Sequence, residues 1–262
     1  MGYSDVYSRA EFYDIAFDFR DVPAECDVIL GLAQRYSGGP QRSFIELAAG
    51  PAAHAREMAT RGLRSVAVDV TPAMVRLGRQ LADEASIDIE YLEADMTSFA
   101  IDEPVDVAAI LMDSLGVLLD NDAVLSHLNC VADALVPGGI YVVEMSHPRS
   151  VFGIKASTEN TWTTDRDGTT VHIAWGKDTD GFDPITQIDE VTVAMQWDGP
   201  NGSGEVEETL PDQRIVPNQL RALVTASQRF EIVAELGSFD SNLPVTNEKK
   251  SWRFIPVLRR LP

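Results

Sequence analysis

The chain has 262 residues, 45% of them hydrophobic, which is enough for one substantial core with a small accessory unit. It carries 21 Lys and Arg against 41 Asp and Glu, a formal net charge of -20 at pH 7. A surface this acidic repels phosphate backbones and argues against nucleic acid as a substrate. No apolar run reaches bilayer length, and the first residues lack the basic flank and apolar stretch of a signal peptide. We therefore expect a cytoplasmic protein with no membrane partner.

The two cysteines, Cys26 and Cys130, indicate packing rather than chemistry. Neither belongs to a C-x-x-C pair, and neither has a histidine at ligand spacing. The sequence therefore predicts no disulfide framework and no metal site.

Residues 1–42 are expected to form an aromatic leader followed by a helix. The leader carries rings at Tyr3, Tyr7, Phe12, Tyr13, Phe17 and Phe19. This is too much apolar surface for a disordered tail. The helix is expected to begin at Pro23 and to end at the Gly- and Pro-containing breaker 37–40.

Between residues 43 and 150, apolar runs alternate with helical patterns. Strands are expected at 43–47, 65–68, 87–92, 105–111 and 140–144, with helices at 52–60, 72–84 and 122–135. This alternation predicts an α/β fold with a parallel sheet, whose ligand edge lies at the carboxyl ends of the strands. We assign residues 43–150 to a ligand-binding core.

The pattern changes after residue 150 to Thr-rich runs punctuated by Gly and Asp. We expect residues 151–212 to form a small antiparallel β insertion, with a hairpin at Asp167-Gly168 and a mobile turn over 198–204. Its aromatic side chains, Trp162, His172, Trp175 and Trp197, would form either an acceptor pocket or the face of a homodimer, and the sequence favours neither. Residues 213–262 are expected to complete the core with a helix over 217–227 and strands over 231–236 and 252–258.

The first expected strand ends in an acid and turns through small residues into a helix. Backbone N–H groups approach a ligand closely only where side chains are tiny, as at Gly50, and a helix that starts there offers unpaired donors. The Glu46 carboxylate would repel a pyrophosphate, whereas it suits the ammonium, sulfonium and ribose of S-adenosylmethionine (SAM). Small residues are also ordinary in any tight strand-to-helix turn, so this turn alone is a weak signal.

Two more acids follow the next two strands. Asp69 can accept hydrogen bonds from both ribose hydroxyls, and Asp95 can accept one from the exocyclic amine of adenine. Met74, in the helix after Asp69, can pack its thioether on a nucleoside ring. Acids after three successive strands are hard to explain as solvated charge.

Residues 1–147 resemble the class I SAM-dependent methyltransferases. That family has an acid followed by a Gly-x-Gly-x-Gly turn, an acid after each of strands two and three, and a Pro-Gly-Gly turn before strand five. The corresponding residues here are Glu46, Ala48, Gly50, Ala52, Asp69, Asp95 and Pro137-Gly138-Gly139. Two glycines are thus alanines, which is acceptable if their backbone angles lie in ordinary regions. The resemblance implies a Rossmann-like seven-stranded sheet of order 3-2-1-4-5-7-6, with strand seven antiparallel, and SAM as cofactor.

The resemblance also implies an aromatic lid over the cofactor. We expect Tyr13 to face the sulfonium, where an aromatic ring attracts a cation, and Arg20 to pair with the SAM carboxylate. Further cofactor contacts are expected from Val70, Met96 and Met112.

Asp113 after strand four and His147 after strand five are the candidates for handling the proton of the acceptor. Each has a plainer interpretation, Asp113 as part of a strand-to-helix loop and His147 as a histidine hydrogen-bonded within a loop. Of the other histidines, His54 is expected to cap the outside of the pocket and His127 to lie on a helix surface.

The sequence therefore predicts a SAM-dependent methyltransferase that transfers a methyl group to an oxygen or nitrogen of a small molecule. One alternative keeps SAM but carries out cyclisation or lyase-type chemistry. Another is a non-catalytic ligand-binding protein on the same fold. A nicotinamide-dependent dehydrogenase is the weakest alternative, because Glu46 opposes a pyrophosphate.

Overall fold

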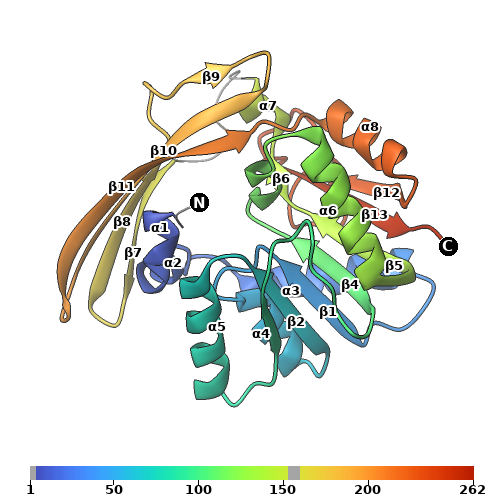
Figure 1. Ribbon diagram of the computed structural model, residues 1–262, viewed down its shortest axis with the longest axis horizontal. Helices are drawn as coiled ribbons and strands as arrows, with labels where there is room; N and C mark the ends of the chain where they lie inside the picture. The colour runs from blue at the N-terminus through green and yellow to red at the C-terminus, as the bar shows by residue number, and fades with distance from the viewer. Residues whose placement is uncertain (1–3, 153–159) are drawn as a thin grey trace.

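The computed structural model describes residues 4–152 and 160–262, which contribute strands to two sheets (Figure 1). The larger sheet runs in the order β12-β13-β5-β4-β1-β2-β3. Its strands are β1 (Ser43–Leu47), β2 (Arg64–Asp69), β3 (Glu90–Glu93), β4 (Val105–Ile110), β5 (Leu135–Val143), β12 (Phe230–Leu236) and β13 (Arg253–Arg260). Strands β1 to β5 are parallel, whereas β13 lies antiparallel between β5 and β12. The predicted fold class and strand order are confirmed.

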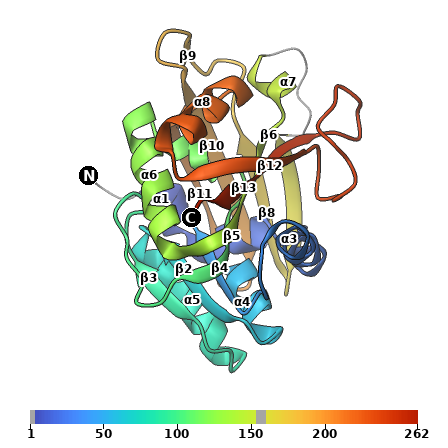
Figure 2. The same cartoon turned by 90° about the vertical axis from the view of Figure 1, so that its right-hand side faces the viewer.

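Helices cover both faces of the larger sheet (Figure 2). One face carries α3 (Val22–Tyr36), α4 (Ala53–Thr60) and α5 (Pro72–Glu84), and the other carries α6 (Asn121–Ala134) and α8 (Pro217–Ser227). Because both faces are covered, all five positions of β1 are buried. The apolar strands and amphipathic helices thus form a three-layer core whose sheet presents one carboxyl edge to ligands.

Local signals in the sequence set where these helices begin. At the start of α3, Asp21 Oδ1 accepts a hydrogen bond from Ala24 N–H at 3.1 Å, and at the start of α6 Asp120 Oδ1 accepts one from Ala123 N–H at 2.7 Å. Pro72 stands in the first turn of α5, where a missing N–H leaves no hydrogen bond unmade. The predicted bounds of α5 and α8 agree with the structure for this reason.

A second, antiparallel sheet of order β11-β10-β8-β7 lies beside the first, with β9 paired to β10. Its strands are β7 (Thr161–Arg166), β8 (Thr169–Trp175), β9 (Phe182–Asp183), β10 (Ile188–Gly199) and β11 (Gly202–Gln213). The ladder between β10 and β11 continues to the pair Gly199 and Gly202, so only two residues connect these strands. The mobile turn predicted over 198–204 is therefore wrong, because most of it is paired strand. Residues 153–159 of the predicted insertion lie outside the described residues.

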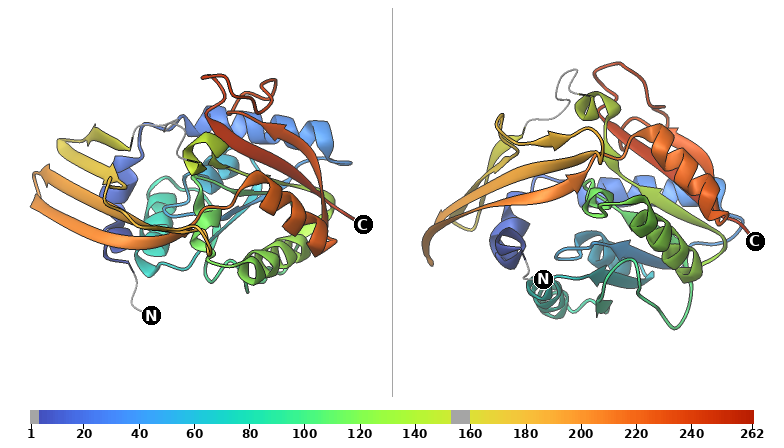
Figure 3. Two further views of the ribbon diagram at one scale, coloured as in Figure 1. Left: turned by 90° about the horizontal axis from the view of Figure 1, so that it is seen from above. Right: turned by 45° about the horizontal axis from the view of Figure 1, so that its top comes forward.

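The N-terminal helices α1 (Asp5–Ser8) and α2 (Ala10–Ala16) lie against the curved second sheet (Figures 1 and 3). Ile15 and Ala16 pack with Val171 and Met195 of that sheet. Trp162 Nε1 also donates a hydrogen bond to the carbonyl of Ala16 at 2.7 Å. The aromatic leader is thus ordered, as predicted, and it joins the two sheets across the ligand edge. Tyr3 lies outside the described residues.

The remaining elements are short and follow β4 and β5. They are the 3-10 turn η1 (Ser114–Val117), strand β6 (Met145–Ser146), which pairs with β13, and helix α7 (Pro148–Val151). Within residues 4–152 and 160–262, no helix is long and apolar enough to cross a membrane. The same residues contain no group of three or more His, Cys, Asp or Glu side chains placed to hold a metal ion.

His127 does not lie on a helix surface, contrary to the prediction. Its side chain is fully buried between α6 and the sheet, with Nδ1 3.0 Å from the carbonyl of Met96 and Nε2 2.6 Å from the hydroxyl of Tyr141. Burial lowers its pKa to about 4, so the ring is neutral at physiological pH. This histidine joins α6 to β5 and does not reach the ligand edge.

Candidate active site

Two adjoining cavities lie at the carboxyl edge of the parallel strands, under the N-terminal helices. The first has a volume of about 460 Å³ and the second about 690 Å³, both in the range of small-molecule sites. The residues that line both are Tyr7, Tyr13, Phe17, Arg20, Met112, Ser114 and Val117. A ligand in one cavity therefore adjoins a ligand in the other across this shared wall.

The turn after β1 contributes to the wall of the first cavity and holds a strained backbone. Ala48, Gly50 and Ala52 have φ of 48°, 54° and 60°. Alanine at the outer positions was expected to have ordinary backbone angles, and this expectation is wrong. Both alanines adopt the left-handed region that glycine favours, at a cost of about 1–2 kcal/mol each. Small side chains are retained where the backbone approaches the cavity.

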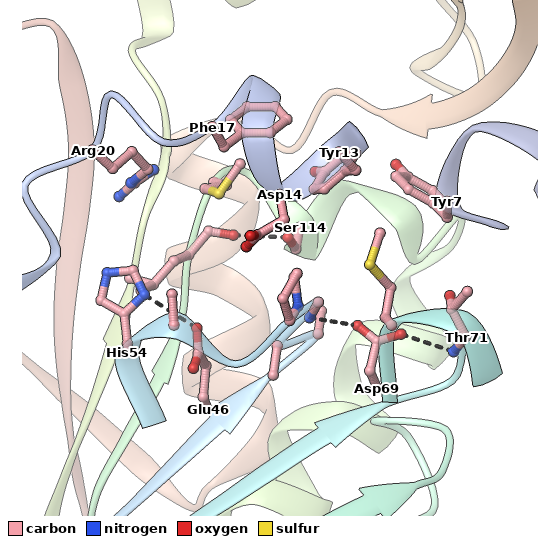
Figure 4. A pocket seen from close by; sticks show the side chains of 18 of the residues that line it. Tyr7, Tyr13, Asp14, Phe17, Arg20, Glu46, His54, Asp69, Thr71 and Ser114 are labelled. Atoms are coloured by element: carbon pink, nitrogen blue, oxygen red, sulfur yellow. Dashed lines mark hydrogen bonds and ion pairs between the residues drawn. The ribbon is translucent and has the colours of Figure 1, made fainter. Parts of the chain in front are cut away.

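Asp69 binds the same turn from the end of β2 (Figure 4). Its Oδ2 accepts a hydrogen bond from Gly50 N–H and its Oδ1 one from Thr71 N–H, each at 2.8 Å. Burial raises the pKa of this carboxyl, while the two backbone hydrogen bonds oppose the rise. Because each oxygen accepts only one of these bonds, further acceptor capacity is left on the carboxylate for a ligand.

Glu46 at the end of β1 is held by the helix that follows it. Its Oε2 accepts a hydrogen bond from Ala55 N–H at 2.7 Å, and its Oε1 lies 3.2 Å from His54 Nδ1. The other ring nitrogen of His54 lies 2.7 Å from Glu25 Oε2 of α3. Burial alone would lower the pKa of His54, but hydrogen bonds to the two glutamates raise it to about 9. His54 is therefore a buried imidazolium that lines the cavity, and the prediction that it caps the outside is wrong.

Arg20 continues this charged network toward the second cavity. Its guanidinium donates to Glu25 at 2.7 Å and to Glu144 Oε2 at 2.9 Å. Glu144 is fully buried at the end of β5, where it also accepts a hydrogen bond from Met112 N–H and lies 2.9 Å from Arg253 Nε. Burial alone would raise the pKa of Glu144, but the two arginines hold it below its usual range. The network fixes Arg20 where both cavities meet.

Aromatic side chains of the N-terminal helices face the carboxylates across the first cavity (Figure 4). Tyr13 packs against Phe17 with ring centroids 4.6 Å apart and against Tyr7 at 5.6 Å. Burial raises the pKa of the Tyr13 phenol well above its usual value. Tyr13 therefore stays neutral, and it offers an aromatic face and a hydroxyl rather than a base.

The second cavity combines aromatic rings with two carboxylates. Trp162 and Trp175 of the antiparallel sheet line it, together with Asp113 and Asp212. Asp113 follows Met112 in the loop after β4, and both residues have positive φ, 58° for Met112 and 64° for Asp113. Strain of this kind is concentrated at functional sites, where surrounding contacts maintain it. The insertion thus contributes directly to the wall of this cavity.

One part of the chain, which provides most of the lining of the first cavity, matches a known protein family. Residues 44–139 match the family model described as a methyltransferase domain. This segment is thus similar to a methyltransferase domain. No curated protein matches the chain. The enzyme class predicted from the sequence is confirmed, and SAM is the methyl donor that this domain implies.

Solved structures of methyltransferases share the fold over nearly the whole chain. A SAM-dependent methyltransferase from Clostridium acetobutylicum has a TM-score of 0.78 at 13% identity, covering 97% of this chain and 98% of its own. The sugar N-methyltransferase KedS8 from Streptoalloteichus has a TM-score of 0.73 at 16% identity, covering 95% and 93%. The SAM-bound amino pentose methyltransferase CalS10 from Micromonospora echinaspora has a TM-score of 0.71 at 16% identity, covering 99% and 98%. The antiparallel sheet thus falls within the shared architecture.

Most of the predicted site residues line one of the two cavities. Those in the first cavity are Tyr13, Arg20, Glu46, Ala48, Gly50, Asp69, Val70, Met74 and Met112, and Asp113 lines the second. Asp95 and Met96 line neither. The Asp95 side chain is exposed and accepts hydrogen bonds from Thr97, whereas Met96 is packed in the core under α6. The structure therefore gives no support to an adenine contact from Asp95.

His147 does not reach either cavity. Its Nε2 donates to the carbonyl of Thr246 at 2.9 Å, and its Nδ1 accepts a hydrogen bond from Arg149 N–H at 3.1 Å as the cap of α7. Because Nδ1 accepts a hydrogen bond it carries no proton, so the ring is neutral, and burial lowers its pKa in the same sense. The plainer interpretation, a histidine hydrogen-bonded within a loop, replaces the prediction of a general base.

Several acidic residues in or beside the cavities were missed in the sequence, among them Glu144, Glu25 and Asp212. Glu144 could have been found by the rule that identified Glu46 and Asp69, because it directly follows a buried strand at the same sheet edge. Glu25 and Asp212 carry no such signal. Their positions depend on how α3 and the antiparallel sheet pack against the core.

Proposed function

We propose that this methyltransferase binds SAM in the first cavity and transfers its methyl group to a nitrogen or oxygen of a small molecule held in the second. The printed names of two structural neighbours support a small-molecule acceptor. KedS8 is a sugar N-methyltransferase, and CalS10 is an amino pentose methyltransferase. They also favour nitrogen over oxygen as the methylated atom.

The side chains of the first cavity fit SAM by their chemistry. The Asp69 carboxylate would accept hydrogen bonds from the ribose hydroxyls, and Val70 and Met74 would pack against the nucleoside. Arg20 would pair with the carboxylate of the methionine moiety, and Glu46 would lie near its ammonium. When bound, SAM supplies a methyl group on a sulfonium, which a nucleophilic acceptor attacks by SN2 displacement.

The shared wall of the two cavities is the observation that carries this proposal. Tyr13, Phe17 and Met112 line both cavities, so they mark where a donor on one side meets an acceptor on the other. Their aromatic and thioether groups exclude water from this place and leave the carboxylates to orient the acceptor. Alignment of this kind accounts for a large share of the rate enhancement in bimolecular reactions.

Asp113 is the predicted residue at the second cavity that would orient the acceptor. It lines the second cavity, and burial raises the pKa of its carboxyl while hydrogen bonding from Ser146 opposes the rise. A carboxylate at this position orients an amine or hydroxyl by accepting its hydrogen bond.

Two measurements test the proposed function. Calorimetry with SAM and with S-adenosylhomocysteine should give micromolar dissociation constants for both, and absence of binding by either at sub-millimolar concentration would overturn the proposal. Mass spectrometry after incubation with SAM and a panel of small amines and alcohols should detect S-adenosylhomocysteine as product. Methylthioadenosine in its place would indicate the non-methylating alternative.

A further inference from the structure

Asp212 is the one member of its row on β11 that reaches the second cavity. Alternate residues of this strand face the N-terminal helices: Val206 and Leu210 pack against them, and Glu208 accepts a hydrogen bond from Val6 N–H at 3.2 Å. Asp212 continues this row to the end of the strand, where its side chain lines the cavity. The antiparallel sheet thus carries a carboxylate to the acceptor side of the site.

The fold keeps space for this carboxylate. Its oxygens lie directly over Gly116 in the 3-10 turn η1, at a place where any larger residue would put a Cβ into contact with them. Among the described residues, the carboxylate makes no hydrogen bond or ion pair. Arg214, which follows the strand, donates instead to Asp189 Oδ1 at 2.7 Å. Asp212 is therefore available to a ligand.

The surroundings of Asp212 favour a cation. Asp113 faces the same cavity, and the rings of Phe17, Trp162 and Trp175 complete its wall. Two carboxyl groups, when ionised, attract a positive charge, and aromatic faces attract cations within about 6 Å. A neutral hydroxyl acceptor would bring no charge to stabilise the ionised form of these carboxyl groups.

We propose that Asp212 and Asp113 together bind the acceptor as a cationic amine, and that Asp212 takes the proton which this amine must lose before it is methylated. This inference rests on the proposed function and deepens it, because it selects a nitrogen nucleophile and assigns it a base. In the step, an N–H bond of the ammonium breaks, its electron pair stays on the nitrogen, and an O–H bond forms on Asp212. The neutral amine then has the lone pair that attack on the methyl carbon requires.

The charges around Asp212 are consistent with a proton-accepting group that works near neutral pH. Burial, followed by repulsion from Asp113 of the β4 loop and Asp189 of β10, raises its pKa to about 8, while Arg214, which follows β11, opposes the rise. Tyr7 of α1 also interacts with it, and Arg20 and Arg253 line the same cavity. In the free site Asp212 is therefore largely protonated at pH 7, and an arriving ammonium lowers its pKa again. We expect binding of an amine to release a proton to solvent.

A matched pair of probes tests this inference without turnover. Cyclohexylamine is a cation at neutral pH, and cyclohexanol has the same ring with a neutral hydroxyl. With S-adenosylhomocysteine bound to the protein, titration followed by tryptophan fluorescence or NMR should show at least about tenfold tighter binding of cyclohexylamine. Calorimetry at pH 7 in two buffers of different ionisation enthalpy should show net proton release on binding of the amine only.

The variant Asp212→Asn keeps the shape of the side chain and removes its charge. It should lose most of the preference for cyclohexylamine and all of the proton release, whereas Glu205→Gln, an exposed charge removal on the same strand, should change neither. Equal binding of the two probes by the unmodified protein would overturn the inference, even if the variant failed to fold. Unchanged preference in Asp212→Asn would overturn it as well. Failure to bind S-adenosylhomocysteine would instead count against the proposed function.

Discussion

Nε2 of His54 lies 2.7 Å from Oε2 of Glu25. This contact joins α4 to α3, the helix that follows the aromatic N-terminal segment. The same ring contacts Glu46, and the pKa of His54 is raised from 6.5 to about 9. A group whose pKa rises on folding contributes stability that is fully present below pH 6.5 and is lost as pH rises through 9. The difference corresponds to roughly 3 kcal/mol of unfolding free energy.

We therefore expect the unmodified protein to lose about 3 kcal/mol more stability between pH 6 and pH 10 than the variant His54→Gln. Urea unfolding at several pH values measures this difference. The variant His172→Gln, which changes an exposed histidine of β8, should follow the unmodified protein. Parallel pH profiles for the protein and His54→Gln would show that the imidazolium bridge contributes nothing.

Removing Arg20 should destabilise the fold, because Glu144 would lose one of its two guanidinium partners. A buried carboxylate without its partner costs about 3–5 kcal/mol, so we expect a clear loss of thermal stability in Arg20→Gln. Adding Glu144→Gln should recover part of this loss, since the unpaired charge is then gone. The control Arg76→Gln removes an exposed arginine of α5 and should have little effect. If Arg20→Gln and this control unfold at the same temperature, the buried charge of Glu144 is not stabilised by Arg20.

The sequence predicted those parts of this molecule that depend on local pattern. Apolar runs located β1 to β5, helix-start residues located α5, and acids at strand ends located Glu46 and Asp69, because each of these signals acts over a few neighbouring residues. Strand order came from the family resemblance. Signals within a few neighbouring residues were thus enough to locate the side chains that directly follow a strand of the parallel sheet.

The histidines show where such reasoning ends. His127 is buried against Tyr141, and His147 is held by Thr246, which lies 99 residues further along the chain. Neither partner can be located from the sequence around the histidine. In the same way, Asp212 lies at the second cavity because of the register in which β11 pairs with β10, which the sequence around Asp212 does not reveal. Side chains at strand ends are informative, whereas their partners depend on tertiary packing.

Asp69 should be essential for binding the ribose. Its carboxylate is anchored by Gly50 and Thr71, and Asp69→Ala removes both the ribose acceptors and the bond that fixes the β1 turn. With hydrogen bonds to charged groups worth about 1.5–3 kcal/mol each, we expect SAM affinity to fall at least about a hundredfold. Calorimetry with SAM measures this, and adenosine alone should show a similar loss. Asp88→Ala, an exposed acid between α5 and β3, serves as the control, and unchanged affinity in Asp69→Ala would refute the ribose role.

The left-handed alanines of the β1 turn offer a test of strain at the cofactor site. Ala48 and Ala52 have φ of 48° and 60°, so Ala48→Gly and Ala52→Gly each relieve about 1–2 kcal/mol of backbone strain. The gain is partly offset by the greater freedom of glycine in the unfolded chain, which costs about 0.4–1 kcal/mol. We expect each variant to be more stable by roughly 0.5–1 kcal/mol in chemical denaturation. Ala59→Gly, within α4, should be less stable by about 1 kcal/mol, because helical backbone carries no such strain.

The same variants separate stability from binding. If the strain serves only to keep small residues at the cavity, both glycine variants should bind SAM as tightly as the unmodified protein. A stabilised variant with weaker SAM binding would mean that alanine at this turn holds the backbone amides in the orientation that the cofactor needs, because glycine would let them fluctuate. A loss of stability in both variants would contradict the left-handed geometry of the turn itself.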